Sequence, residues 1–262
     1  MSIDINPWGD ITGIRPVKII RNMIKNGCSD EQIKAEFTNT HKVSLNKTLL
    51  SLDIAKREIE ILKDIGDNDV CLYIGVPFCK TRCLYCSFVT NTANKSQHLM
   101  KPFVNSLIEE IKYTAELLKH TNFRIISVYM GGGTPTTLSA EDLEAIIKEC
   151  YRYFDLSSVR EFTVEAGRPD TIDKEKLNTL KKCGVTRISI NPQSMNNETL
   201  KLIGRHHTPE EIFECVNLAR ECGFDNINMD VIAGLPMETL NDFVYTVKTV
   251  TEMNPESVTV HT

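Results

Sequence analysis

The sequence from Val70 onward alternates between short apolar, β-rich runs and amphipathic helical segments. The runs that can form strands lie at residues 71–76, 125–130, 161–165, 187–191, 226–232 and 257–261. Capping sequences at Ser139, Thr208 and Thr239 open three of the intervening helical segments. Strands that alternate with helices form a parallel sheet with the helices outside it, and right-handed crossovers curl that sheet. We therefore expect an α/β fold, a partial parallel (β/α)6 barrel.

The sequence before this region has a purely helical pattern. Pro16 can open a first helix that Gly27 ends, because proline is tolerated in the first turn and glycine favours the end. Ser29 and Gln32 form a capping box that starts a second helix. Apolar residues recur at helical spacing over residues 44–64, which predicts a third.

A polar turn at residues 66–69 separates the two patterns. We therefore expect a small N-terminal helical segment at residues 1–66 and an α/β core at residues 67–262. The last predicted strand runs to the end of the sequence, with no helix after it to cover it. We expect from this that the C-terminal part of the core is missing and that the chain belongs to a longer protein.

Composition excludes several classes of protein. The net charge of -5 differs from the basic balance of nucleic-acid-binding domains, so we expect no nucleic-acid partner. With 41% hydrophobic residues the chain can bury a large core. No apolar run approaches the roughly 18 residues of a membrane-spanning helix, and the first residues lack the apolar centre of a signal peptide. We expect a cytoplasmic protein without a membrane span.

Unusual polar and glycine-rich residues follow the predicted strands at their carboxyl ends. In strand order they are Cys79, Cys83 and Cys86, then residues 131–135, then Glu165, then Asn191 and Gln193, then residues 234–236. A glycine run alone is usually a turn, and polar residues at a barrel rim are often simple caps. Parallel strands, however, bring their carboxyl ends to one rim, where ligands bind. The sequence therefore predicts a binding site at this rim.

The nine cysteines indicate metal or redox chemistry rather than disulfides, because their number is odd and nothing marks the chain as secreted. Cys79, Cys83 and Cys86 form a C-x3-C-x2-C motif. Three thiolates on one loop suit three irons of a cubane cluster and leave the fourth iron open. Zinc and coincidence are the alternatives, and a zinc site would need a fourth ligand such as His98 or His261.

The other cysteines in the predicted core are expected to be small buried hydrophobes. They are Cys71 in the first predicted strand and Cys150, Cys183, Cys215 and Cys222 on helices.

The C-x3-C-x2-C motif after a first strand resembles that of the radical S-adenosylmethionine (SAM) superfamily. The motifs that agree with it are YIGVPFC at 73–79, GGGTP at 131–135, TVE at 163–165, QS at 193–194, LIGR at 202–205 and DVIAGLP at 230–236. Together, over residues 70–262, they resemble the oxygen-independent coproporphyrinogen III dehydrogenase family. PWG at 7–9, TGIRP at 12–16 and the final SVTVHT resemble its HemZ-type members.

The resemblance implies a radical SAM oxidoreductase of haem biosynthesis. A [4Fe-4S] cluster on Cys79, Cys83 and Cys86 would bind SAM at its open iron. An electron from a donor such as flavodoxin or ferredoxin would cleave SAM to methionine and a 5′-deoxyadenosyl radical. The radical would take a hydrogen from a propionate of coproporphyrinogen III, which would lose CO2 to become a vinyl group. The protein would position these groups and exclude water.

The resemblance also implies which residues contact SAM. Tyr73 matches an aromatic residue beside the cluster-bound SAM, and Glu165 matches a carboxylate that contacts it. The loop against the SAM methionine matches Gly132, Gly133 and Thr134. Some members hold a second SAM, so one or two molecules are expected. The residues that match this second site are Tyr85, Gln193, Arg205 and Asp230.

One position departs from the family pattern. The characterised dehydrogenases carry a further cysteine two residues after the third, where this chain has Phe88. Relatives that carry haem also lack that cysteine. A haem-binding carrier on the same core is therefore an alternative, and a radical SAM enzyme with another substrate is a third.

Overall fold

The computed structural model describes residues 6–11, 15–88 and 91–262. The chain forms two compact units, Met1–Asp67 and Asn68–Thr262. Within the described residues, no helix combines the length and the apolar character that crossing a membrane requires.

The first unit is a cluster of helices. It contains α1 (Pro16–Lys25), α2 (Asp30–Ala35), the π-helical turn η1 (Glu36–Thr40) and α3 (Leu45–Leu62). The predicted capping box at α2 is present, because the Ser29 and Gln32 side chains each accept from the other's backbone N–H. Ile20, Ile33 and Phe37 are fully buried among these helices. Burial of such side chains, each worth about 1.5–3 kcal/mol, stabilises this small unit.

The second unit is built on a six-stranded sheet whose order is β1-β4-β5-β6-β7-β8. Its strands are β1 (Asp69–Val76), β4 (Arg124–Gly132), β5 (Glu161–Glu165), β6 (Arg187–Ser189), β7 (Ile227–Ile232) and β8 (Ser257–His261). Every neighbouring pair is parallel. Spatial order therefore follows chain order, and the predicted strands and their partial, unclosed parallel arrangement are confirmed.

One strand is shorter than predicted. β6 ends at Ser189, although the apolar pattern runs to residue 191. Beyond it, Gln193 adopts a φ of 65° and forms an isolated bridge with Val231 of β7. The chain therefore turns across the end of β7 instead of continuing the ladder.

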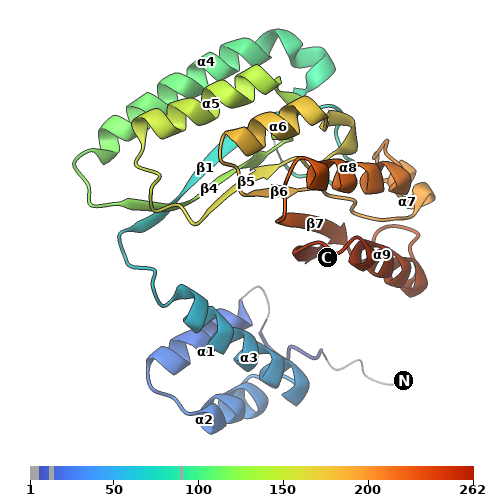
Figure 1. Cartoon of the computed structure of the whole chain (residues 1–262). Helices are drawn as coiled ribbons and strands as arrows, with labels where there is room; N and C mark the ends of the chain where they lie inside the picture. The colour runs from blue at the N-terminus through green and yellow to red at the C-terminus, as the bar shows by residue number, and fades with distance from the viewer. Residues whose placement is uncertain (1–5, 12–14, 89–90) are drawn as a thin grey trace. The chain divides into compact units, whose positions relative to one another are not determined.

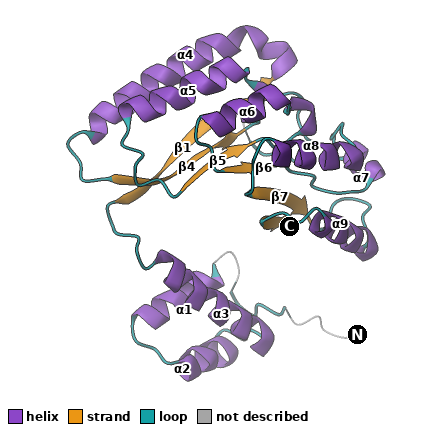
Figure 2. Cartoon of the chain, in the orientation of Figure 1, coloured by secondary structure: helices purple, strands orange, loops and turns teal. Residues whose placement is uncertain are grey.

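Helices connect the strands and cover one face of the sheet (Figures 1 and 2). They are α4 (Ala93–Leu118), α5 (Ala140–Tyr153), α6 (Lys174–Lys182), α7 (Asn197–Leu202), α8 (Pro209–Glu221) and α9 (Leu240–Glu252). Two short 3-10 turns, η2 (Pro135–Thr137) and η3 (Pro169–Thr171), follow β4 and β5. A separate two-stranded parallel pair, β2 (Phe78–Cys79) and β3 (Asn91–Thr92), follows β1.

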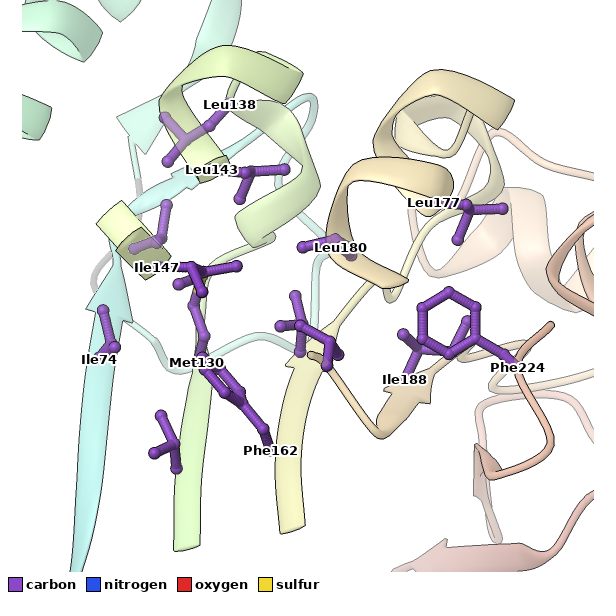
Figure 3. Close-up of a cluster of buried hydrophobic side chains, with 14 of the residues drawn as sticks. Ile74, Met130, Leu138, Leu143, Ile147, Phe162, Leu177, Leu180, Ile188 and Phe224 are labelled. Atoms are coloured by element: carbon purple, nitrogen blue, oxygen red, sulfur yellow. The ribbon is translucent and has the colours of Figure 1, made fainter. Parts of the chain in front are cut away.

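The main core lies between the sheet and these helices (Figure 3). Met130 and Phe162 point from the strands toward helices α5 and α6, which contribute Ile147 and Leu180. Cys150, Cys215 and Cys222 are buried as predicted, and Cys183 is half-buried. This layer fixes the strand ends that carry the site.

Cys71 is not in the core, so that prediction is wrong. Side chains alternate between the two faces of a strand. Ile74 and Val76 of β1 are buried, whereas Cys71 and Tyr73 lie on the opposite, exposed face. An apolar run does not reveal which of its two faces the helices cover.

Candidate functional site

A cavity of about 600 Å³ opens at the carboxyl ends of the strands. Residues that follow β1, β4, β5, β6 and β7 line it, as the rim argument predicts. Those among them that the sequence singled out as site residues are Cys79, Tyr85, Cys83, Cys86, Gly132, Gly133, Thr134, Glu165, Gln193, Arg205 and Asp230. The volume lies within the range of about 300–1,000 Å³ that small-molecule and cofactor sites occupy.

The cysteine loop is held by contacts with the rim and by a turn of its own. The Leu84 N–H donates to the carbonyl of Ile203 at 3.0 Å. The Cys86 N–H donates to the Cys83 carbonyl at 3.2 Å. Cys79 Sγ lies 3.4 Å from the Thr134 hydroxyl, which belongs to the glycine loop after β4. The three cysteines therefore line a preformed cavity, and contacts with the neighbouring loops of the rim fix the loop that carries them.

Two buried arginines lie beside the cysteine loop. Arg168 is 3% exposed, donates from Nη1 to the Thr81 carbonyl and from Nη2 to the Thr81 hydroxyl, and places Nη1 4.0 Å from Cys83 Sγ. Arg205 is 5% exposed and donates to the carbonyls of Gly167 and Asn191 at 2.9 and 3.1 Å. Buried cations are costly unless an anion compensates them. The surroundings of Cys83 therefore suit a negatively charged group.

The three thiols fit an iron–sulfur cluster better than a single metal ion. Among the described residues, no three His, Cys, Asp or Glu side chains surround one point as ligands of one ion. A cubane cluster makes no such demand, because each thiolate binds a different iron. Burial raises the pKa of the Cys79 thiol, and the Thr134 hydroxyl and the Arg168 charge oppose that rise.

The glycine loop is required by the packing of the protein itself. A Cβ on Gly133 would lie 2.5 Å from the Phe78 carbonyl oxygen. A Cβ on Gly131 would lie 2.6 Å from the Tyr129 ring and 3.0 Å from the Glu165 carboxyl carbon. Gly132 has a φ of 103°, which disfavours other residues. The glycines thus let the rim close on the cysteine loop and on Glu165.

Glu165 ends β5 and accepts a hydrogen bond from the Tyr129 hydroxyl of β4. Burial raises the pKa of Glu165, and the Tyr129 hydrogen bond and the Gly132 N–H oppose the rise while the charge of Asp230 adds to it. Burial and the adjacent Glu165 also raise the pKa of Tyr129, so its hydroxyl stays protonated and donates. The pair therefore presents a partly desolvated carboxyl group to the cavity.

Several polar atoms lining the cavity have no protein partner. Asn191 Oδ1, Gln193 Oε1 and Arg205 Nε are buried without a hydrogen-bond partner among the residues that the structure describes. Asp230 accepts from Asn228 Nδ2 at 2.7 Å and lies 3.6 Å from His261 Nε2. Buried polar groups in native proteins are nearly always satisfied, so orphaned ones in a cavity indicate a ligand.

Tyr85 joins the cysteine loop to the polar wall of the cavity, which is formed by Asn191, Gln193, Arg205 and Asp230. Its hydroxyl accepts from Arg205 Nη2 at 3.3 Å. Burial raises the pKa of Tyr85 to about 12, against the opposing charge of Arg205.

Of the predicted site residues, Tyr73 is the one outside the lining of the cavity. Its side chain is 58% exposed and stacks on Tyr129, with ring centroids 6.0 Å apart. A Cβ on Gly132 would lie 3.3 Å from the Tyr73 hydroxyl, so Tyr73 stands beside the lining of the cavity and next to Tyr129, the partner of Glu165.

Sequence reasoning missed Arg168 and Tyr129 and gave Asn191 only a place on the rim. The available signal for Arg168 was its position three residues after Glu165, in the loop that follows a strand. Tyr129 lies within an apolar run, where a tyrosine gives no distinct signal. Contacts with Thr81 and Glu165, far away in sequence, give these residues their place in the site.

Comparison with known proteins agrees with this geometry. A family profile described as "Radical SAM superfamily" matches residues 73–250. HemZ of Bacillus subtilis (strain 168), described as oxygen-independent coproporphyrinogen-III oxidase-like, is 43% identical over 97% of this chain and 52% of its own length. The heme chaperone HemW of the same strain is 35% identical over 72% of this chain and 49% of its own.

Among solved structures, coproporphyrinogen III oxidase (HemN) from Escherichia coli, a radical SAM enzyme, superposes with a TM-score of 0.67. It is 29% identical and is matched over 79% of this chain and 47% of that chain. The chain thus spans about half the length of these relatives. Since the family profile covers most of this chain, the chain belongs to the radical SAM superfamily, whose members use a [4Fe-4S] cluster and SAM.

Proposed function

We propose that this chain carries the catalytic core of a radical SAM oxidoreductase of tetrapyrrole synthesis. The proposed reaction converts coproporphyrinogen III to protoporphyrinogen IX without oxygen. The observation that carries the proposal is one cavity that gathers the three cysteines, the glycine loop, Glu165 and orphaned polar atoms. The similarity to HemZ and to HemN supports the choice of substrate.

Cys79, Cys83 and Cys86 would hold the cluster, and the cavity beside them would hold SAM. When bound, the two groups supply one-electron cleavage of SAM and a carbon radical that abstracts hydrogen from the substrate. Gly132, Gly133 and Thr134 would offer backbone groups to the methionine part of SAM.

The polar wall would orient the ligands in the cavity. The Glu165 carboxylate, fixed by Tyr129, is an acceptor for the ammonium or hydroxyl groups of SAM. Arg205 and Asp230 present a guanidinium and a carboxylate on the same wall, and Gln193 and Tyr85 lie beside them. Such a wall would bind a second SAM or the carboxylates of the substrate.

The direct test is an anaerobic reaction followed by mass spectrometry. It contains the reconstituted protein, SAM, a reductant and coproporphyrinogen III. The proposal predicts a tetrapyrrole that has lost two carboxyl groups, with a matching amount of 5′-deoxyadenosine. Deoxyadenosine without any change in the porphyrinogen would contradict the proposed substrate. Flavodoxin or ferredoxin, the proposed cytoplasmic electron donors, can replace the chemical reductant in the same assay.

A haem chaperone is the second candidate. Phe88 stands where the dehydrogenase pattern has a cysteine, and its side chain is 61% exposed at the lining of the cavity. Similarity to the heme chaperone HemW supports this alternative. Stable binding of haem by the protein and transfer of that haem to an apo-haemoprotein, without porphyrinogen oxidation, would favour the chaperone over the dehydrogenase.

A further inference from the structure

The cysteine loop encloses a buried positive charge that the proposed chemistry has not used. Arg168 follows β5, and its side chain is 3% exposed. Both terminal nitrogens donate to Thr81, which lies between Cys79 and Cys83. Nη1 also lies 4.0 Å from Cys83 Sγ. A single guanidinium thus contacts both the backbone of the loop and one of its thiols.

The charge of Arg168 is only partly compensated by a carboxylate. Asp170 Oδ1 lies 3.6 Å from Arg168 Nε, and within the described part of the chain neither atom has a hydrogen-bond partner. The other oxygen of Asp170 lies 3.7 Å from the Lys80 ammonium. Asp170 is therefore shared between two cations. A buried arginine in this position needs a further anion on its thiol side.

A cluster bound to three thiolates provides that anion. An oxidised [4Fe-4S] core carries two positive charges, so three thiolates give a net negative charge, which grows by one when the cluster gains an electron. Cluster potentials depend on net charge, on hydrogen bonds to sulfur and on solvent exposure. A buried cation beside one ligand stabilises the reduced state more than the oxidised state.

We propose that Arg168 is a positioning residue that sets the reduction potential of the cluster: it anchors the cysteine loop through Thr81 and makes the cluster easier to reduce. This inference rests on the cluster assignment in the proposed function. It does not depend on the identity of the final substrate.

The test is a redox titration of the reconstituted cluster, followed by electron paramagnetic resonance, in the wild type and in Arg168→Gln. Removing the charge should make one-electron reduction at least about tenfold less favourable, a shift of about 59 mV to more negative potential. Arg168→Lys keeps the charge but lacks the planar fork that binds Thr81. Its reduction potential should recover more than half of the change seen in Arg168→Gln. It should also retain less cluster than the wild type.

Two neighbouring charges provide controls in the same loop region. Lys80→Gln removes a cation whose side chain is 49% exposed, and solvent screening should keep its potential close to that of the wild type. Asp170→Asn removes the carboxylate that competes for Arg168 and should shift the potential in the positive direction. Opposite shifts for Arg168→Gln and Asp170→Asn would be difficult to explain by loss of folding.

The outcomes separate this inference from the proposed function. A wild-type chain that binds no four-iron cluster would overturn the cluster assignment itself. If the wild type binds the cluster and neither Arg168→Gln nor Asp170→Asn changes its reduction potential, the inference is overturned and the proposed function stands. If Arg168→Gln retains no cluster, the inference still predicts a potential close to that of the wild type in Arg168→Lys and a more positive potential in Asp170→Asn. An unchanged Asp170→Asn would then refute the electrostatic role.

Discussion

At the scale of single residues, the site depends on groups whose environment differs from what their sequence neighbours indicate. The GGG run at residues 131–133 indicates a loop that approaches a ligand. In the structure, however, atoms of the protein itself lie where a Cβ on Gly131 or Gly133 would be. The sequence indicates that Glu165 is a carboxylate at the rim, and in the structure that carboxylate accepts a hydrogen bond from the Tyr129 hydroxyl. These residues therefore affect stability as well as binding.

We predict that Gly133→Ala destabilises the second unit. The new Cβ would lie 2.5 to 2.9 Å from backbone atoms of Phe78 and Val76. These backbone atoms cannot move away without disturbing the strands and turns to which they belong. Overpacking of this kind typically costs about 1–3 kcal/mol. Denaturant unfolding measures the change. Gly75→Ala is the matched control, because among the described residues its Cβ would meet only the Tyr73 ring, at 3.4 Å. Equal stability of the two variants would contradict this account of the loop.

We predict that Glu165→Ala weakens SAM binding and leaves iron content intact. Loss of a charge-assisted hydrogen bond costs about 1.5–3 kcal/mol, or roughly 10–100-fold in affinity. Equilibrium binding of SAM to the reconstituted protein, together with iron and sulfide analysis, checks both parts. An unchanged SAM affinity would remove Glu165 from the binding site.

Glu165 also predicts a pH effect on stability in the absence of ligands. Its pKa is raised by burial, so the folded state holds the proton more tightly than the unfolded state. Stability should therefore fall as pH rises through the folded pKa, and Glu165→Gln should remove that part of the decline. Unfolding free energies measured in a pH series that rises from the ordinary pKa of a glutamate, about 4.3, test the sign. Glu161→Gln, on the same strand with its side chain 44% exposed, is the control. A parallel pH dependence in wild type and Glu165→Gln would refute the prediction.

At the scale of elements, local sequence signals mark the helix starts well. The capping boxes at Thr208 and Thr239 and the cap at Ser139 are formed as predicted. These signals act within one helical turn, so they do not depend on the rest of the fold. Strand ends depend on contacts distant in sequence, since the end of β6 is set by the contact of Gln193 with β7.

We predict that Thr208→Ala costs about 1 kcal/mol of stability, because it removes the hydroxyl that accepts from the Glu211 N–H at the start of α8. Thermal or denaturant unfolding measures the loss. Thr92→Ala is the matched control, because the Thr92 side chain at the start of α4 makes no capping hydrogen bond to a described residue. A loss of the same size at both positions would show that capping is not the cause.

At the scale of the whole molecule, parallel topology made the site predictable. Strands in one direction bring their carboxyl ends together, so Cys79, Glu165 and Gln193 could be assigned to one rim from strand assignments alone. Arg168 could not be found in this way, because its role depends on the meeting of two loops distant in sequence. Cys71 was misplaced because an apolar run does not reveal which of its faces is covered.

The central claim is that the cavity beside the cysteine loop binds a [4Fe-4S] cluster which cleaves SAM. The most direct test measures iron, sulfide and 5′-deoxyadenosine after anaerobic reconstitution of the wild type, Cys83→Ala and Cys71→Ala. Cys71 is an exposed cysteine in the same unit and serves as the control. The account predicts about four irons per chain and SAM cleavage in the wild type and Cys71→Ala, with both lost in Cys83→Ala. Retention of SAM cleavage in Cys83→Ala would contradict it.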